Sequence, residues 1–450
     1  MNYIILLLTA AACSILAIYE RDFSCMFVPL TFLVLGNLLI RIFAEKRNGE
    51  VYRRVYNITS FCYYLYAIAC YLYMKSNGFD FLLVSDTATA YIPYTKDFME
   101  IDSLSEMWDL TFNNDIANKY RHVGIITIYF AYVGKYAQMY GTELYFCLQA
   151  SIIFFSGFVS VFLYKLLKIF EIQHPFRYTL VYSLLSVYFY YSSLILREAP
   201  ISMFYMIIFC YLWNTDEHIS AKNVILILLS IIFTFLLRPE MGIFACIFLL
   251  IYLTKNYKNT PTYVVSLLTA LAIVFFFFRF DVYNVYKDNQ EHFRNILEDV
   301  GSASTLNSLN RLPPVVSQIA KVIYIQLSPI PSWSFISLGQ WANETNNIMG
   351  LPRAIAVFYN YIVWTFFIYF LINIRTFRPS RTDLLLIAAV LIFLFLQTES
   401  TEQRRMQACF PIIFAHALVV KQSRDSSTCE KLLFAGTLVF ITMQIFGISK

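Results

Sequence analysis

Residues 25–56 read CMFVPLTFLVLGNLLIRIF and then AEKRNGEVYRRVY, an apolar run followed directly by a basic loop. A helix that crosses the hydrocarbon core of a bilayer needs roughly 20 mainly apolar residues, a length that the run 25–43 approaches. The loop 44–56 carries four basic side chains, Lys46, Arg47, Arg53 and Arg54. Because short loops rich in Lys and Arg stay on the cytoplasmic side, this stretch predicts a membrane span that ends in the cytoplasm.

The rest of the chain repeats this pattern. Of its 450 residues, 59% are hydrophobic and only 14% are charged, whereas a soluble domain is about a quarter charged. We therefore expect an all-α polytopic transmembrane protein that forms a single integral membrane domain over residues 1–450. About thirteen spans are predicted, at 2–18, 25–43, 57–74, 144–166, 178–195, 199–213, 223–237, 241–254, 262–278, 353–373, 383–397, 407–420 and 431–448. The first lacks a basic n-region and a small-residue cleavage site, so we expect it to be retained.

Segment 123–138 decides how the chain is threaded through the membrane. It is apolar, but it contains Gly124, Gly134 and Lys135. If it does not cross, the N-terminus and the later basic loops all lie in the cytoplasm, as the charge rule requires. These loops are 164–177, 255–261, 374–382 and 421–431. We therefore expect 123–138 to be a re-entrant or surface helix inside a first external loop, 75–143.

A second external loop is predicted over residues 279–352. Within it, residues 315–327 form another apolar stretch with few charges. We expect this stretch to lie as a helix on the outer surface of the bilayer. Most of the hydrophilic mass is thus predicted on the external side.

The charge and the motif content exclude several classes of protein. The net charge of +5 comes from basic residues scattered between apolar segments, so binding to nucleic acid is not expected. Most of the nine cysteines lie inside apolar runs, without a disulfide framework or zinc spacing. The sequence has no HExxH, Walker A, CxxC or GxGxxG pattern, which leaves ATP-driven transport and metal hydrolysis without support. We predict no metal site and no cofactor.

Three short turns on the predicted external side each bring Arg and Glu together. They are Leu196-Arg197-Glu198, Leu237-Arg238-Pro239-Glu240 and Glu402-Gln403-Arg404-Arg405. An Arg–Glu pair is also an ordinary way to end a helical hairpin, so a single turn is explained equally well without a function. Three turns on one side favour a shared site, and guanidinium groups bind phosphate in a bidentate manner. The predicted phosphate-binding residues are Arg197, Arg238, Arg404 and Arg405.

Two carboxylates and one histidine are the candidate catalytic groups. Asp86 and Glu240 lie near the predicted membrane edge, where either could accept a proton from a sugar hydroxyl. For Asp86 the alternative is the N-cap of a helix that begins near Thr87. His122 could act as a base or a phosphate partner, because imidazole titrates near neutral pH; its alternative is an interfacial side chain. His416 lies within a predicted span, and we expect it to be packed and hydrogen-bonded.

The order of these features resembles a known group of enzymes. An Asp–Tyr segment is followed by the first two Arg turns, a long late loop with Pro–Pro and aromatic residues, and a final Arg pair. The residues concerned are Asp86, Tyr91, Tyr94, Arg197, Arg238, Arg404 and Arg405. As an arrangement over most of the chain, this resembles the O-antigen and exopolysaccharide polymerases of bacterial surfaces. That group is similar to the polytopic glycosyltransferases of the GT-C type, which use lipid-linked sugars.

The motifs behind this resemblance are short and degenerate. The resemblance therefore depends on their order along the chain and on their predicted position on the same side of the membrane. Glu198 stands where the exopolysaccharide polymerases usually have Gln. A His often accompanies the second turn, where this chain has Arg238 and Glu240. These departures bear on the acid–base assignment more than on the fold.

The resemblance implies a metal-independent membrane glycosyltransferase on the outer face of the cytoplasmic (inner) membrane. Such enzymes move a growing glycan from undecaprenyl pyrophosphate onto a new lipid-linked repeat unit. The four arginines would stabilise the charge on the pyrophosphate leaving group, and Asp86 or Glu240 would take the proton of the acceptor hydroxyl. Direct displacement would invert the anomeric carbon. Membrane lipids, a flippase and chain-length regulator proteins are the other partners that the resemblance implies.

Other functions compete with this one. An O-antigen ligase, or another lipid-linked-sugar glycosyltransferase, would use nearly the same site. A transporter or flippase for lipid-linked oligosaccharide would be expected to show inverted repeats and charges near the midplane, whereas here the charges lie at one edge. A sensor or an acyltransferase is disfavoured, because none of the five histidines has convincing partners in the sequence.

Overall fold

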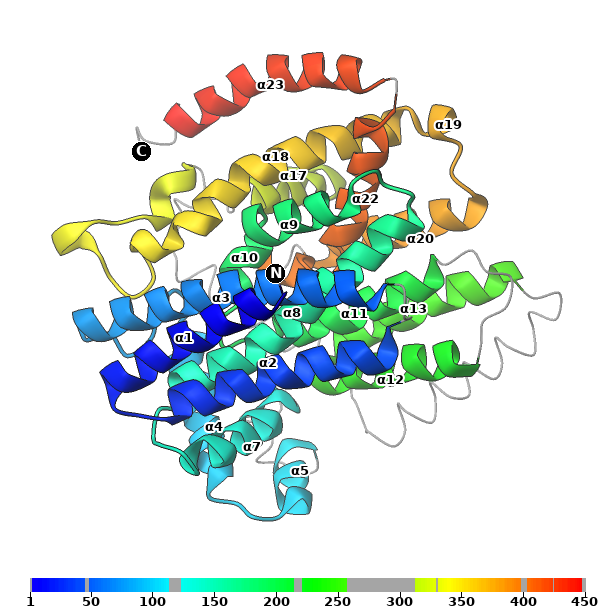
Figure 1. Ribbon diagram of the computed structural model, residues 1–450. Coiled ribbons are helices and arrows are strands. Elements are labelled where there is room, and N and C mark those ends of the chain that lie inside the picture. The colour runs from blue at the N-terminus through cyan, green and yellow to red at the C-terminus, as the bar shows by residue number, and fades with distance from the viewer. Residues whose placement is uncertain are drawn as a thin grey trace. The chain divides into compact units, whose positions relative to one another are not determined.

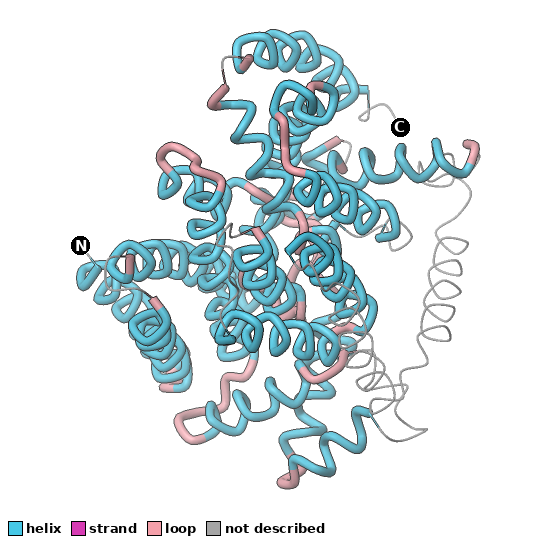
Figure 2. The backbone as a smooth tube through the Cα atoms, turned by 90° about the vertical axis from the view of Figure 1, so that its right-hand side faces the viewer, coloured by secondary structure: helices cyan, strands magenta, loops and turns pink. Residues whose placement is uncertain are grey.

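The structure is a computed structural model of an all-helical chain. It describes residues 2–44, 48–112, 123–213, 221–256, 312–328, 331–397, 403–423 and 425–446. Figure 2 shows helices and connecting loops throughout these ranges, with no strand among them. The predicted all-α class is confirmed for this part of the chain. The predicted span 262–278 and the first part of the loop 279–352 lie outside the described residues.

Four described helices are long and apolar enough to cross a membrane, judged by length and composition alone. They are Tyr3–Glu20, Ser24–Ile42, Tyr145–Ile169 and Ile348–Ile372. Shorter apolar helices are Glu198–Leu212, Ile225–Leu237, Pro239–Ile251, Val316–Leu327 and Phe410–Lys421. These helices agree with a membrane protein, whereas the full number of spans stays a prediction.

The chain divides into two compact units. The first comprises Met1–Met206 and Ser332–Tyr359, and the second comprises Ile207–Pro331 and Asn360–Lys450. Helices of the first unit are α1 (Asn2–Glu20), α2 (Ser24–Phe43), α3 (Gly49–Asn77), η1 (Thr87–Tyr91), α4 (Ile92–Met99), α5 (Leu104–Phe112), α7 (Ile126–Gln138), α8 (Tyr145–Ile169), α9 (Pro175–Leu185), α10 (Val187–Tyr191), η3 (Ser332–Phe335), η4 (Gly339–Trp341) and η5 (Ile348–Gly350).

Helices of the second unit are α12 (Ala221–Leu237), α13 (Pro239–Asn256), α17 (Pro314–Leu327), α19 (Ile374–Phe377), α20 (Arg381–Leu396), α21 (Gln403–Met406), α22 (Phe410–Lys421) and α23 (Ser426–Phe446). Two helices begin in the first unit and end in the second, α11 (Glu198–Leu212) and α18 (Leu351–Ile372).

Helices α1, α2, α3 and α8 run side by side in the first unit (Figure 1). Their closest packing surrounds the ring of Tyr56 on α3, which is buried against Gly36 of α2 and Gly157 of α8. A Cβ atom added at Gly157 would lie 2.6 Å from this ring. Small residues that let helices approach closely are typical of helix packing in membranes. The two glycines therefore set the spacing of α2, α3 and α8.

Helix α3 extends the predicted span 57–74 at both ends and stops at a glycine. Gly78 has a left-handed backbone with φ of 67°, which glycine adopts without the penalty of a Cβ atom. The N–H groups of Gly78 and Phe79 donate to the carbonyl oxygens of Lys75 and Met74, at 3.2 and 3.0 Å. These bonds satisfy the last carbonyls of the helix and end it there.

The chain before residue 78 and the chain after residue 142 meet at one end of the helical bundle. Lys75 Nζ, at the end of α3, lies 3.5 Å from the carboxylate of Glu143, which directly precedes α8. Tyr71 donates its hydroxyl to the same carboxylate at 2.7 Å. Lys75 also lies 2.9 Å from Glu20 at the end of α1. We call this end of the bundle, defined by Glu20, Lys75 and Glu143, the Lys75 end.

Helix α7 corresponds to the predicted segment 123–138. It has 13 residues, which is about 20 Å at 1.5 Å per residue, against roughly 30 Å for the hydrocarbon core of a bilayer. It runs antiparallel to α2, since the ring of Phe27 stacks on Tyr140 at 4.6 Å and that of Phe32 lies 6.5 Å from Tyr129. That segment 123–138 is a re-entrant or surface helix inside an external loop stays a prediction.

The predicted span 178–195 is not one continuous helix, so this prediction is wrong in detail. Helix α9 ends at Leu185, and α10 begins at Val187. Between them Ser186 has an extended backbone (φ −76°, ψ 165°). Its hydroxyl oxygen accepts a hydrogen bond from the N–H of Tyr188 at 3.2 Å. The side chain caps α10 in place of the backbone bond that would have continued α9.

In the second unit, α17 corresponds to the predicted apolar stretch 315–327. Its buried side chains include Ser317, Lys321 and Gln326, whereas Val316, Ile319 and Ile323 are exposed. The helix therefore buries three polar side chains, together with Ile325, and exposes three apolar ones. This is the reverse of a surface helix in a soluble protein, and it agrees with a lipid environment. That α17 lies on the outer membrane surface stays a prediction.

The Tyr56 contact gives a test of the packing. Gly157→Ala should force the Tyr56 ring to move, and overpacking of this kind costs about 1–3 kcal/mol. We expect a lower midpoint of thermal unfolding for the purified protein in detergent. Gly49→Ala is the matched control, because a Cβ atom there would lie at an ordinary 3.6 Å from its nearest neighbour. Equal midpoints for the two variants would contradict the role assigned to Gly157.

Candidate functional site

The Arg238 turn joins α12 to α13 through a single residue. The N–H of Arg238 donates to the Thr234 carbonyl at 2.8 Å, and its own carbonyl accepts from the N–H of Met241 at 3.1 Å. Pro239 starts α13, where its missing N–H leaves no bond unmade. The Arg238 side chain is 4% exposed, and its Nε lies 3.4 Å from Glu240 Oε1. The hairpin that the sequence predicts here is therefore tight, and its arginine is buried.

A buried guanidinium group is unusual, because Arg is mostly exposed unless it is paired. Glu240, one position into α13, supplies a negative charge for Arg238. Charges interact more strongly in such a position than they do in water. That Arg238 also binds an anionic substrate stays a prediction.

Arg404 and Arg405 lie on α21, a single helical turn in the same unit as Arg238 and Glu240. Both arginine side chains are half-buried. They stand between Gln403 and Gln407, which are buried. The two arginines are thus flanked by buried amide side chains, and their predicted role in binding phosphate stays a prediction.

Two other predicted site residues, Asp86 and Arg197, belong to the first unit, as does Glu198 beside Arg197. Asp86 is half-buried and precedes η1, which begins at Thr87 as expected, but its side chain makes no capping hydrogen bond. Glu198 is 5% exposed at the start of α11. Because Arg197 and Arg238 fall in different units, the shared phosphate site stays a prediction.

Sequence reasoning missed Arg353 in the first unit. Its guanidinium group lies 5.6 Å from the ring centre of Tyr190 on α10, a favourable cation–π distance. Tyr190 stands seven positions before Arg197. The stretch Leu351-Pro352-Arg353 opens an apolar helix on the predicted external side. This is the signal that singled out the other arginines, so it could have found Arg353 as well.

The loop before α18 reaches the segment that carries Asp86. The N–H of Leu83 donates to the carbonyl of Glu344 at 2.6 Å, and the hydroxyl of Tyr66 donates to that of Met349 at 2.8 Å. The two loops that are predicted as external are therefore in contact within the first unit. Asp86 follows Leu83 by three positions and so lies close to this junction.

Asp22 joins the turn between α1 and α2 to the turn before α8. Its carboxylate accepts the N–H groups of Ser24, Thr142 and Glu143 at 2.9, 2.6 and 2.9 Å, and the hydroxyls of Ser24 and Thr142 as well. A Cβ atom at Gly141 would overlap with this carboxylate. Burial favours the neutral acid, but these hydrogen bonds outweigh it and lower the pKa of Asp22 below the ordinary 3.8. This contact was not predicted from the sequence.

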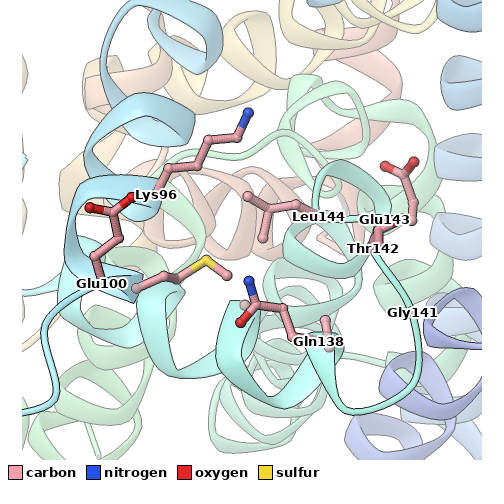
Figure 3. A pocket seen from close by; sticks show the side chains of 10 residues that line it. Lys96, Glu100, Gln138, Gly141, Thr142, Glu143 and Leu144 are labelled. Atoms are coloured by element: carbon pink, nitrogen blue, oxygen red, sulfur yellow. The ribbon is translucent and has the colours of Figure 1, made fainter.

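A pocket of about 330 Å³ lies between α4, α7 and the turn before α8. Figure 3 shows Lys96 and Glu100 of α4 on one side and Gln138 of α7 on another. The close approach of α7 to Met99 depends on Gly134, where a Cβ atom would overlap with the sulfur. The predicted site residues do not line this pocket. Its lining carries both signs of charge, and it suits a small polar molecule.

Of His122 and His416, the structure describes only His416. His122 lies outside the described residues. His416 is buried, its Nδ1 donates to the carbonyl of Ile412 at 2.8 Å, and its ring lies 4.9 Å from that of Phe370. The expectation of a packed, hydrogen-bonded His416 is confirmed. In the described ranges no three His, Cys, Asp or Glu side chains are grouped to hold a metal ion, and the nine cysteines are free thiols.

No protein-family model, no curated protein and no solved structure matches this chain. Its function is therefore inferred from its own residues and contacts.

Asp22 predicts how stability depends on pH. Its folded pKa is lowered, so its contribution is complete above the ordinary value of 3.8 and is lost as the pH falls through the folded value. Asp22→Asn removes acceptor capacity and should cost about 1–3 kcal/mol at neutral pH. We expect the gap in unfolding midpoint between wild type and variant to stay constant from pH 8 to about pH 5 and to narrow below about pH 4.

Gly141→Ala is the companion variant, because it displaces the Asp22 carboxylate while keeping it chemically intact. It should lower the midpoint at neutral pH as Asp22→Asn does. A gap that stays the same down to pH 3 would argue against the hydrogen-bonded Asp22 carboxylate.

Proposed function

We propose that this protein is a membrane glycosyltransferase that joins oligosaccharide repeat units carried on undecaprenyl pyrophosphate into a surface polysaccharide. The observation that carries the proposal is Arg238, a buried guanidinium group at a helix junction, paired with Glu240 at 3.4 Å. A buried cation at the end of two apolar helices is suited to a lipid-linked phosphate. Arg404 and Arg405 add two more cations in the same unit.

The reaction is a displacement at the anomeric carbon of the growing glycan. The hydroxyl oxygen of the acceptor unit attacks this carbon, and the bond to the pyrophosphate oxygen breaks. The electron pair leaves with undecaprenyl pyrophosphate, whose charge the arginines stabilise. The hydroxyl proton passes to a carboxylate, and the configuration at the carbon is inverted.

The contacts of the two candidate bases favour Asp86 over Glu240. The carboxylate of Glu240 is held by the Arg238 guanidinium, which gives it a role in keeping the cation buried. Asp86 lies near the junction of the two long loops that are predicted as external. We assign Asp86 as the proton acceptor and Glu240 as a positioning residue for Arg238.

The proposed site lies on the external face of the cytoplasmic membrane. The contact between Lys75 and Glu143 at 3.5 Å supports this orientation, because it joins the chain before residue 78 and the chain after residue 142 at one end of the bundle. The short α7 supports it as well. With no crossing in this segment, the N-terminus and the later basic loops share the cytoplasmic side, as the charge rule requires. The Lys75 end is then external.

Arg238 can be tested in cells that lack their own copy of the gene. Arg238→Ala should leave single repeat units in place of long chains on a gel of the surface glycan, with chain growth about 10- to 100-fold slower, since bonds to charged groups contribute about 1.5–3 kcal/mol. Arg238→Lys should retain part of the activity, because it keeps the charge and loses the planar fork.

Arg375→Ala on α19 is the control and should leave chain length unchanged, with protein amounts compared by immunoblot. Long chains in the Arg238→Ala strain would refute the phosphate role. Long chains that accumulate on the lipid would indicate a ligase instead, and repeat units that accumulate inside the cell would indicate a flippase.

The orientation can be tested by cysteine labelling of intact cells with an impermeant maleimide. Asn77→Cys and Met139→Cys, at the two ends of residues 78–142, should both react from outside; Met139 is 73% exposed. Lys168→Cys, at the other end of α8, should react only after permeabilisation. Wild type measures the background from native thiols. Labelling of positions 77 and 139 from opposite sides would mean that α7 crosses.

A further inference from the structure

Four amide side chains are buried together in the second unit. They are Gln326 of α17, Asn360 of α18, Gln403 of α21 and Gln407, which follows α21. Their exposed fractions are 1%, 0%, 2% and 2%, in that order. Buried amides are retained where each polar atom has a hydrogen-bond partner. We call these four residues the amide cluster.

Three of the four amide nitrogens donate to backbone carbonyl oxygens, and the fourth, Gln326 Nε2, donates to the sulfur of Met406 at 3.0 Å. The carbonyl of Gln326 accepts from Asn360 Nδ2 at 3.0 Å and from Gln403 Nε2 at 3.3 Å. The carbonyl of Gln403 accepts from Gln407 Nε2 at 3.4 Å. A carbonyl oxygen can only accept, so these contacts fix which end of each amide is the nitrogen. The oxygen of each amide therefore points elsewhere.

Three oxygens of the cluster are the unusual feature. Asn360 Oδ1, Gln403 Oε1 and Gln407 Oε1 are buried, and no residue of the described ranges donates to them. Gln326 differs, because its side-chain oxygen accepts from Trp364 Nε1 at 3.5 Å. Leaving a buried acceptor without a donor costs the full desolvation of that atom. Three such acceptors in one cluster point to a ligand that brings O–H or N–H groups.

The neighbouring charges narrow the class of ligand. Arg404 and Arg405 stand between Gln403 and Gln407. Clustered amide oxygens could also bind a hard cation, but two guanidinium groups on the same turn repel one. Prenyl and acyl chains have no hydrogen-bond donors. A sugar attached to a phosphate has hydroxyl donors for the oxygens and negative charge for the arginines.

We propose that the amide cluster is the subsite for the sugar that is linked directly to the pyrophosphate, with Arg404 and Arg405 on the pyrophosphate itself. This inference rests on the proposed glycosyltransferase function and identifies the residues that would recognise the sugar of its substrate. Each of these amide nitrogens donates one hydrogen bond within the protein, whereas the three oxygens accept none from the described residues, so the subsite mainly offers acceptors. It selects sugars that present hydroxyl or acetamido N–H groups, and it disfavours a deoxy sugar at this position, since a buried acceptor would stay unpaired.

The test measures binding to the full-length protein in lipid nanodiscs by microscale thermophoresis. One probe is undecaprenyl pyrophosphate, and the other is the same lipid carrying one N-acetylhexosamine. Gln403→Met and Gln407→Met each remove one amide with little change in volume. Each should weaken binding of the sugar-bearing lipid about tenfold, as expected for one lost hydrogen bond to a buried group, and should leave binding of the bare lipid unchanged. Arg404→Ala should weaken binding of both lipids.

Gln444→Met on α23 is the matched control, because Gln444 is a buried glutamine (2% exposed) outside the cluster. It should bind both lipids as wild type does, and unfolding midpoints are measured for every variant. The subsite is refuted if Gln403→Met and Gln407→Met bind the sugar-bearing lipid like wild type, or if they lose both lipids equally. Water, or the protein alone, would then satisfy the amides. If wild type binds neither lipid, the proposed function fails, and this inference fails with it.

Discussion

The carboxylate of Asp22 accepts the backbone N–H groups of Ser24, Thr142 and Glu143, and so holds the beginning of α8 against the turn between α1 and α2. Lys75 reinforces the same place through Glu20 and Glu143. Several features of the first unit depend on these hydrogen bonds and ion pairs. They bring the chain after residue 142 back to the end of the bundle where the chain before residue 78 ends, and they leave α7 as a short helix beside α2. The side of the membrane assigned to each arginine turn depends on that return.

Polar groups in the second unit are placed inward, where apolar helices surround them. Helix α17 exposes Val316, Ile319 and Ile323 and buries Gln326, and Arg238 is buried beside Glu240. In lipid, apolar surface gains little from being hidden, while every polar group gains from a partner inside the protein. Polar side chains in such a protein therefore mark where substrates or structural partners are bound. The amide cluster is the densest example in the described part of this unit.

Hydropathy predicted the helices well, because length and apolar content decide whether a segment is helical in a membrane protein. The predicted spans 144–166 and 353–373 correspond to Tyr145–Ile169 and Leu351–Ile372. Hydropathy failed at Ser186, where one side-chain hydrogen bond interrupts the helix although the sequence is apolar on both sides. The pair of Arg238 and Glu240 was predictable, since its members are neighbours in sequence. The amide cluster was not, because Gln326, Asn360 and Gln403 are far apart in the chain and amides barely alter hydropathy. The hydrogen bond between Asp22 and Glu143 was not predictable either, because the two residues are far apart in the chain.

The hydrogen bonds of Asp22 also have a consequence for biogenesis. Helices α1, α2 and α3 are synthesised before Thr142 and Glu143, so Asp22 first has only the donors of Ser24 in its own turn. Tyr56 likewise has Gly36 at that stage, but not Gly157. At about 5–20 residues per second, synthesis of residues 78–143 takes roughly 3–13 s. During that time we expect the three helices to be incomplete, with Tyr56 lacking Gly157 and the Asp22 carboxylate lacking the donors of Thr142 and Glu143. Helix α8 and the turn before it supply both sets of contacts, so we expect the first unit to be complete only once α8 is in place.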